Sequence, residues 1–195
     1  MMRLARQLTA PLAALALVGC FGGAKVPPVL LTLSPETAAL AQVNRSASAG
    51  DAITVEVPIT PKELKSVRVP AQVGATSVAY IKDLQWVDTP DRLFQKLLSE
   101  TVTRTTGRVV LDPNQSSLDP GVHVTGQLQR FGYDASEGSA VVVYDAAMST
   151  AGGTRVETRR FEARAPADGT AGTVGPALNR AANQVAIEAA RWIGG

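Results

Sequence analysis

An α/β fold, in which helices cover a mixed sheet, is the fold class that this 195-residue sequence predicts. Apolar and polar residues alternate in short segments between residues 53 and 163, which is the pattern of half-buried strands. Apolar residues recur at helical spacing in two further segments, 88–107 and 174–193. The elements therefore follow one another as strands, a helix, more strands and a final helix.

The first strands are short. Ile53, Val55 and Val57 alternate with polar residues up to Pro58, which predicts a half-buried strand. The same alternation recurs at 67–69 and at 78–86. These segments predict a set of short strands before the first helix.

The first helix is expected between residues 88 and 107. Asp88 and Thr89 are followed by Pro90, which is a typical helix start, and Gly107 is a typical helix end. The residues with helical spacing on one face are Leu93, Phe94, Leu97, Leu98 and Val102. This face predicts the side of the helix that packs on the sheet.

The second half of the domain predicts an antiparallel meander. A short apolar strand is expected at 108–111, and longer strands are expected at 122–133, 139–148 and 154–163, with short Gly- and Ser-rich turns between the longer ones. The final segment, 174–193, has an apolar face made largely of small residues, which predicts a closely packed amphipathic helix.

The N-terminus has the layout of a secretory signal peptide, residues 1–19. Two arginines precede an apolar run at 11–18, which is well short of the roughly 20 residues that span a bilayer. With their removal, the 19 basic and 17 acidic residues of the chain become 17 of each. A mature domain with no net charge has no electrostatic footprint for nucleic acid, so we expect no nucleic-acid partner.

The only cysteine of the chain ends this N-terminal segment. Leu17, Val18 and Gly19, followed by Cys20, resemble the bacterial lipobox. The resemblance implies that Cys20 becomes the first residue of the mature protein and carries diacylglycerol and an N-acyl chain such as palmitate, which together anchor a protein firmly to a membrane. The alternatives are an ordinary secreted protein with a free cysteine, or a cysteine buried in the core.

The segment from 20 to 50 is rich in Gly, Pro, Ala and Ser and has no sustained period, so we expect it to be a flexible tether. Its exception is the apolar run 29–33, which could add a short strand or dock on the domain. The folded domain is expected at 51–195.

Chemical motifs are scarce. His123, the only histidine, lies in a strand candidate without cysteine or histidine partners at metal-binding spacing, and no nucleophile motif adjoins it. The sequence contains no phosphate-binding loop, nucleophile elbow or zinc-protease motif. We therefore expect a protein that is not an enzyme and that uses no metal or cofactor. Trp86 and Trp192 could be anchors of a partner interface, although a core role is favoured for each.

The segment 77–90 and the helix after it are the most distinctive part of the chain. A strand candidate ends in Trp86 shortly before the leucine-rich helix that contains Leu93 and Leu97. Together with the lipobox, this segment resembles the ABC-type transport auxiliary lipoproteins, the outer-membrane partners of MCE-domain lipid transporters, including the paraquat-inducible operon type. The resemblance implies a three-layer α/β domain with a mixed, largely antiparallel sheet flanked by two main helices.

The function that the resemblance implies is that of a non-catalytic periplasmic lipoprotein in an MCE/ABC-type lipid transport system. It would dock, or complete the transport path, at the outer membrane, lipid-anchored on the periplasmic face, with an MCE-domain protein as its partner. Phe21 after the cysteine favours the outer membrane, because an aspartate there retains enteric lipoproteins at the inner membrane. Alternatives are a lipoprotein that scaffolds or activates a cell-wall or surface-assembly machine, and a lipid-binding carrier. The chain could also form a homo-oligomer.

Overall fold

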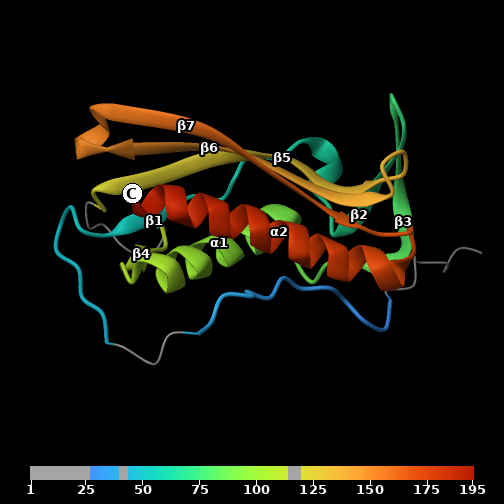
Figure 1. The fold of residues 1–195 in the computed structure, drawn as a ribbon, viewed down its shortest axis with the longest axis horizontal. Coiled ribbons are helices and arrows are strands. Elements are labelled where there is room, and N and C mark those ends of the chain that lie inside the picture. Colours follow the sequence, from blue (N-terminus) through green and yellow to red (C-terminus); the bar gives the residue numbers. More distant parts are fainter. Residues whose placement is uncertain (1–26, 40–43, 114–119) are drawn as a thin grey trace, which may run out of the picture.

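A seven-stranded mixed sheet and a pair of helices make up most of residues 27–39, 44–113 and 120–195, which are the residues that the computed structural model describes (Figure 1). Both helices lie on the same face of the sheet, and an extended N-terminal segment crosses the helix pair on the side away from the sheet. The predicted α/β class, with a mixed sheet and two main helices, is confirmed. The sheet and the helix pair form two layers, and the extended segment lies against the helix pair.

The meander forms the larger part of the sheet. Its strands are β5 (Val122–Asp134), β6 (Ser139–Thr150) and β7 (Arg155–Pro166), and both pairings are antiparallel along the whole strand, as predicted. A short 3-10 turn, η2 (Ala151–Gly153), joins the last two strands. Successive residues of these strands therefore face the helices and the opposite side of the sheet in turn.

The short strands share the remaining edge of β5. β1 (Ile53–Val55) runs parallel to the start of β5, and β2 (Arg68–Gly74) runs parallel to its end. β4 (Val110–Leu111) then pairs in parallel with β1, and β3 (Ser77–Gln85) pairs antiparallel with β2 as a hairpin. The parallel pairings are short and the long ones are antiparallel, so the sheet is mixed in the proportion expected.

The structure corrects the first strand. Because β1 lies between β4 and β5 in the sheet, Ile53, Thr54 and Val55 are all buried. The expected half-buried strand up to Pro58 is therefore wrong, and Val57 is 45% exposed. The chain still follows β5 beyond the strand, with Ile59 N–H donating to the Gly126 carbonyl at 2.9 Å.

The two helices are α1 (Pro90–Thr106) and α2 (Ala171–Gly194). Gly107 ends α1 with a φ of 70°, a left-handed conformation that glycine adopts without a steric penalty. The face predicted for α1 is buried as a whole, and α2 starts three residues earlier than expected. Small residues of α2 allow its close packing, namely Ala177, Ala181, Ala182, Ala186, Ala189 and Ala190, all of which are buried.

Aromatic rings fill the space between the sheet and the helices. Phe94 of α1 lies 5.0 Å from Tyr144 of β6 and 6.5 Å from Phe131 of β5, measured between ring centroids. Trp86 contacts Phe131 in turn, with its centroid 5.4 Å away. Gly126 makes this packing feasible, because a Cβ there would lie 2.5 Å from the Tyr144 ring. Burial raises the pKa of Tyr144, whose hydroxyl donates a hydrogen bond to the Thr125 carbonyl at 3.3 Å.

Candidate functional site

The N-terminal segment from Leu31 to Thr37, which we call the strap, is held on the domain. Its first residue extends the sheet: Leu31 N–H donates to the Gln85 carbonyl at 2.8 Å, and Val87 N–H donates to the Leu31 carbonyl at 2.9 Å. The apolar run predicted as an exception within the tether thus docks beside Trp86. Figure 1 shows the strap, in blue, passing along the helix pair.

Two asparagines of α2 clamp the strap. Asn183 is 1% exposed, and it accepts from Glu36 N–H at 2.7 Å and donates to the Ser34 carbonyl at 2.9 Å. Asn179, one turn earlier, accepts from Ser34 N–H at 2.9 Å. An arginine of α1, Arg104, donates to the carbonyl of Thr37 at the end of the strap. The strap is therefore hydrogen-bonded to both helices. The division of the chain into a tether, 20–50, and a folded domain, 51–195, stays a prediction.

Replacing Asn183 by alanine tests the clamp. Asn183→Ala leaves the strap amide and carbonyl without their partners, so we expect a loss of about 1–3 kcal/mol in the free energy of unfolding. Urea denaturation measures this loss, and hydrogen exchange should show the Glu36 amide newly exposed. Gln184→Ala, at the exposed neighbouring position, is the control and should change neither. Unchanged protection of Glu36 in Asn183→Ala would contradict the clamp.

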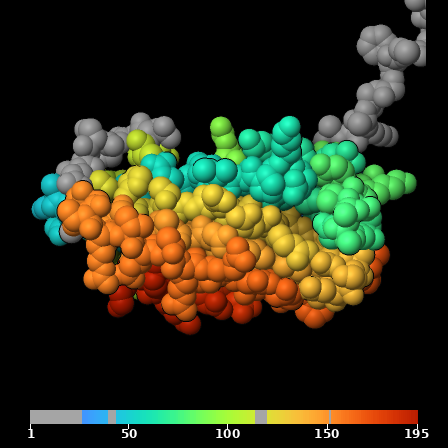
Figure 2. Space-filling model, turned by 90° about the horizontal axis from the view of Figure 1, so that it is seen from above, coloured from blue at the N-terminus to red at the C-terminus, as the bar shows by residue number. Residues whose placement is uncertain are grey.

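The sheet face away from the helices, here called the outer face, is open to solvent over β5, β6 and β7 (Figure 2). It contains a shallow groove, the outer groove, of about 430 Å³. Its apolar contributors include Val57, Ile59 and Ala147, and its polar ones include Gln127 and Thr158. Ile59 is 68% exposed. An apolar hollow with polar sides is the composition expected of a protein contact surface.

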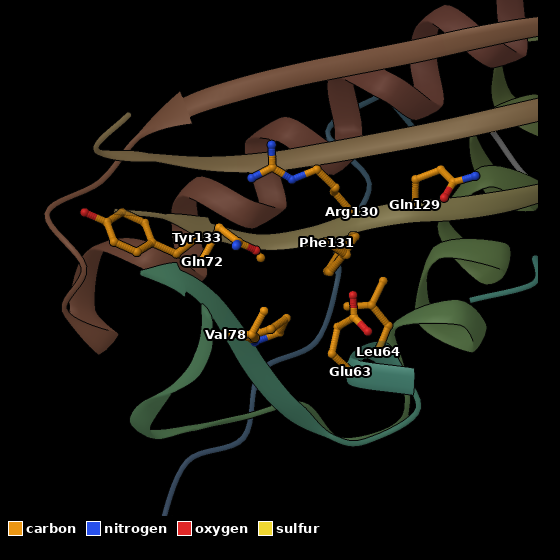
Figure 3. Close-up of a pocket in the computed structure, with 10 residues that line it drawn as sticks. Glu63, Leu64, Gln72, Val78, Gln129, Arg130, Phe131 and Tyr133 are labelled. Atoms are coloured by element: carbon orange, nitrogen blue, oxygen red, sulfur yellow. The ribbon is translucent and has the colours of Figure 1, made fainter. Parts of the chain in front are cut away.

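A second hollow lies where the β2–β3 hairpin and the 3-10 turn η1 (Lys62–Leu64) meet β5 (Figure 3). Figure 3 shows Val78 of the hairpin and Leu64 of η1 on one side and Arg130 of β5 on the other. Its volume is about 50 Å³, room for water molecules but not for a substrate or a lipid chain. The hollow is therefore a small gap where the hairpin, η1 and β5 meet, and it is too small to be a binding cavity.

Acidic groups on and beside the outer face are held in their charged form. Hydrogen bonds from Ser136 and Arg130 lower the pKa of Asp134 to about 2, and the Arg130 nitrogen lies 2.6 Å from this carboxylate. The Arg160 guanidinium, hydrogen-bonded to Asp145, lowers the pKa of that carboxyl in the same way. A general acid at neutral pH needs a raised pKa, so these carboxyls are suited to holding the sheet face together.

The structure places the residues singled out in the sequence apart from one another. Trp86 is 2% exposed and belongs to the core, so it has no surface to offer a partner. Trp192 is partly buried, and its ring centroid lies 5.7 Å from that of Phe161. His123 is on β5, with Nε2 3.1 Å from Oε1 of Glu56 at a solvent-exposed position. Cys20 and its lipobox residues 17–19 lie outside the described residues.

Two further observations concern the described residues only. Within 27–39, 44–113 and 120–195, no group of three or more His, Cys, Asp or Glu side chains is arranged to hold a metal ion. None of the helices in these ranges is long and apolar enough to cross a membrane.

The strap, the outer groove and the ion-paired sheet face thus belong to one α/β domain. The family model of the ABC-type transport auxiliary lipoprotein component matches residues 31–190, and the chain belongs to this family. The match begins at Leu31, the first residue of the strap. The family resemblance predicted from the sequence is thus confirmed. This family consists of auxiliary lipoproteins of ABC-type transport.

Solved structures share the fold. The protein XCC0632 from Xanthomonas campestris has a TM-score of 0.61 at 16% identity, over 85% of this chain and 91% of that one. An uncharacterized protein has a TM-score of 0.62 at 16% identity, over 75% and 94% of the two chains. A PelC dodecamer from Paraburkholderia phytofirmans has a TM-score of 0.38 at 9% identity, over 73% of this chain and 93% of that one. No curated protein matches the chain significantly.

Proposed function

We propose that the chain is a non-catalytic lipoprotein on the periplasmic face of the outer membrane, where it docks or completes the path of an MCE/ABC-type lipid transporter. The observation that carries the proposal is the family match over residues 31–190. Cys20 would carry the acyl chains, and the energy for transport would come from an ATPase elsewhere in the system.

The absence of catalysis is supported by the state of the polar groups. Hydrogen bonds lower the pKa of Asp134 and of Asp168 to about 2, and in Asp168 the Thr173 hydroxyl contributes most. His123 lies beside Glu56, without a serine or cysteine nucleophile in the contact. Both carboxyls are therefore ionised at neutral pH, whereas acid–base catalysis needs a group that exchanges protons near neutral pH.

The packing of the core favours docking over carriage of a lipid inside the domain. A carrier of this size needs an apolar hollow, and in the described chain the rings of Phe94, Phe131 and Tyr144 occupy the space between sheet and helices. The outer groove is open to solvent and shallow, which suits a protein segment better than an enclosed acyl chain.

Affinity capture tests the proposal. The tagged full chain is cross-linked in cells, extracted in mild detergent, and its partners are identified by mass spectrometry. We expect an MCE-domain protein, and we expect its capture to survive moderate salt, because a chain without residues 1–19 has no net charge and Val57, Ile59 and Ala147 give the outer groove apolar surface. Recovery of a cell-wall synthase in its place would support the scaffold alternative.

A further inference from the structure

The β2–β3 hairpin projects from one end of the molecule (Figures 1 and 2). Between Arg68 and Lys82 the sequence contains no charged residue, in a chain of which 18% of residues are charged. Val73 and Val78, close to its turn, are 55% and 47% exposed. A protruding hairpin that is both uncharged and apolar at its tip is unusual for a surface that faces only water.

The N-terminal segment enters the domain at the same end. Leu31 is paired with Trp86, directly after β3, and Val29 and Leu30 before it are exposed. Val87, beside Leu31, is 53% exposed. Among the described residues, five of the eight large apolar side chains that are exposed therefore lie at this end of the molecule.

The strap shortens the reach of the lipid anchor. Because Leu31 is fixed to the sheet, only the ten residues 21–30 lie between it and Cys20, and the two positions are at most about 40 Å apart. Trp86 N–H donates to the Val67 carbonyl, so the hairpin from there to its turn at residues 75–76 is at most about 30 Å long, the length of its β2 side. If Cys20 is acylated, as the proposed function requires, the bilayer lies within reach of the hairpin tip.

We propose that the β2–β3 hairpin and residues 29–30 form a membrane-contact patch, whose apolar side chains enter the interface of the lipid bilayer that holds the acyl chains. The base of the hairpin fits this placement. The Arg68 guanidinium lies 4.0 Å from the centroid of the Tyr80 ring, and Lys82, two residues further along β3, is exposed. Aromatic and basic side chains favour the headgroup region, so the patch has apolar residues at the tip and headgroup-binding residues behind them.

A fluorescent probe at two matched positions tests the patch. Val78→Cys and Val156→Cys each place a thiol on an exposed strand position, and Val156 lies at the opposite end of the meander, next to the β6–β7 turn. The full-length lipoprotein is purified from membranes, and each thiol is labelled with an environment-sensitive fluorophore. The labelled lipoprotein is then reconstituted into phosphatidylethanolamine–phosphatidylglycerol vesicles, with or without nitroxide-labelled lipid. An acylated Cys20 does not react with the label.

We expect the nitroxide lipid to quench the probe at position 78 at least about threefold more than the probe at position 156. Adding Val73→Asp should abolish this difference, because a carboxylate at the tip opposes entry into the interface. Equal quenching at both positions in acylated protein would overturn the patch and leave the proposed function intact. A blue-shifted probe at position 78 that lipid does not quench would mean that a second copy covers the hairpin, and would also overturn the patch. Absence of acyl chains on Cys20, read by mass spectrometry, would overturn both.

Discussion

The Phe94→Asp variant should fail to form a stable domain. Phe94 is fully buried, and its ring contacts Tyr144 and Phe131 across the interface between α1 and the sheet. Loss of a buried phenylalanine ring costs about 3–5 kcal/mol, and an unpaired carboxylate in its place adds a further penalty. The sum is comparable to the whole stability of an ordinary domain, about 5–15 kcal/mol.

Thermal unfolding followed by circular dichroism measures this effect. Arg92→Asp, two residues earlier on the exposed side of the same helix, introduces the same carboxylate without touching the core, and should shift the melting temperature little. If Phe94→Asp melted at the wild-type temperature, the packing of α1 on the sheet would be wrong.

The Cys20→Ser variant is expected to lose its acyl chains altogether. A serine offers no thiol for the diacylglycerol group. Metabolic labelling with a clickable fatty acid should therefore drop to background, and unprocessed precursor should accumulate. Labelling at the wild-type level would show that the lipid is not on Cys20.

A strain that lacks the gene provides the functional readout for the same variant. We expect it to be sensitive to detergent, and we expect Cys20→Ser to leave it so. His123→Ala is the matched control and should restore resistance, because the side chain of His123 is exposed and pairs only with Glu56 among the described contacts. Failure of a well-folded His123→Ala variant would reopen the question of catalysis.

The regular elements could be predicted because their signals are local. Gly107 ends α1 through its own backbone freedom, and the short turns at residues 135–138 and 151–153 leave the meander strands little choice of partner. No local sequence pattern indicates that β1 and β2 pair with the same edge of β5. Alternation tells which residues of a strand are buried only when one face is exposed, so it misassigned β1, where both faces are covered.

The strap could not be predicted from its composition, because what holds it lies far away in the sequence. Asn183 bonds to Ser34 across 149 positions. A signal was nevertheless present in α2, where Asn179 and Asn183 are one turn apart on a helix that is otherwise rich in alanine and apolar residues. A buried asparagine such as Asn183 needs hydrogen-bonding partners, since its amide must be satisfied. The outer groove was not predicted either. The alternation of residues 53–57 had placed Val57 on the buried side of a strand, whereas Val57 lines the groove.

The measurement that tests the central claim most directly is the identity of the protein that contacts the outer groove in living cells. A photo-cross-linking residue at position 59 reports on the groove, and one at position 156, on the same face near the β6–β7 turn, is the control. An MCE-domain protein cross-linked from position 59, and not from position 156, is the predicted result. A cell-wall synthase cross-linked from position 59 would contradict the assignment to a lipid transport system.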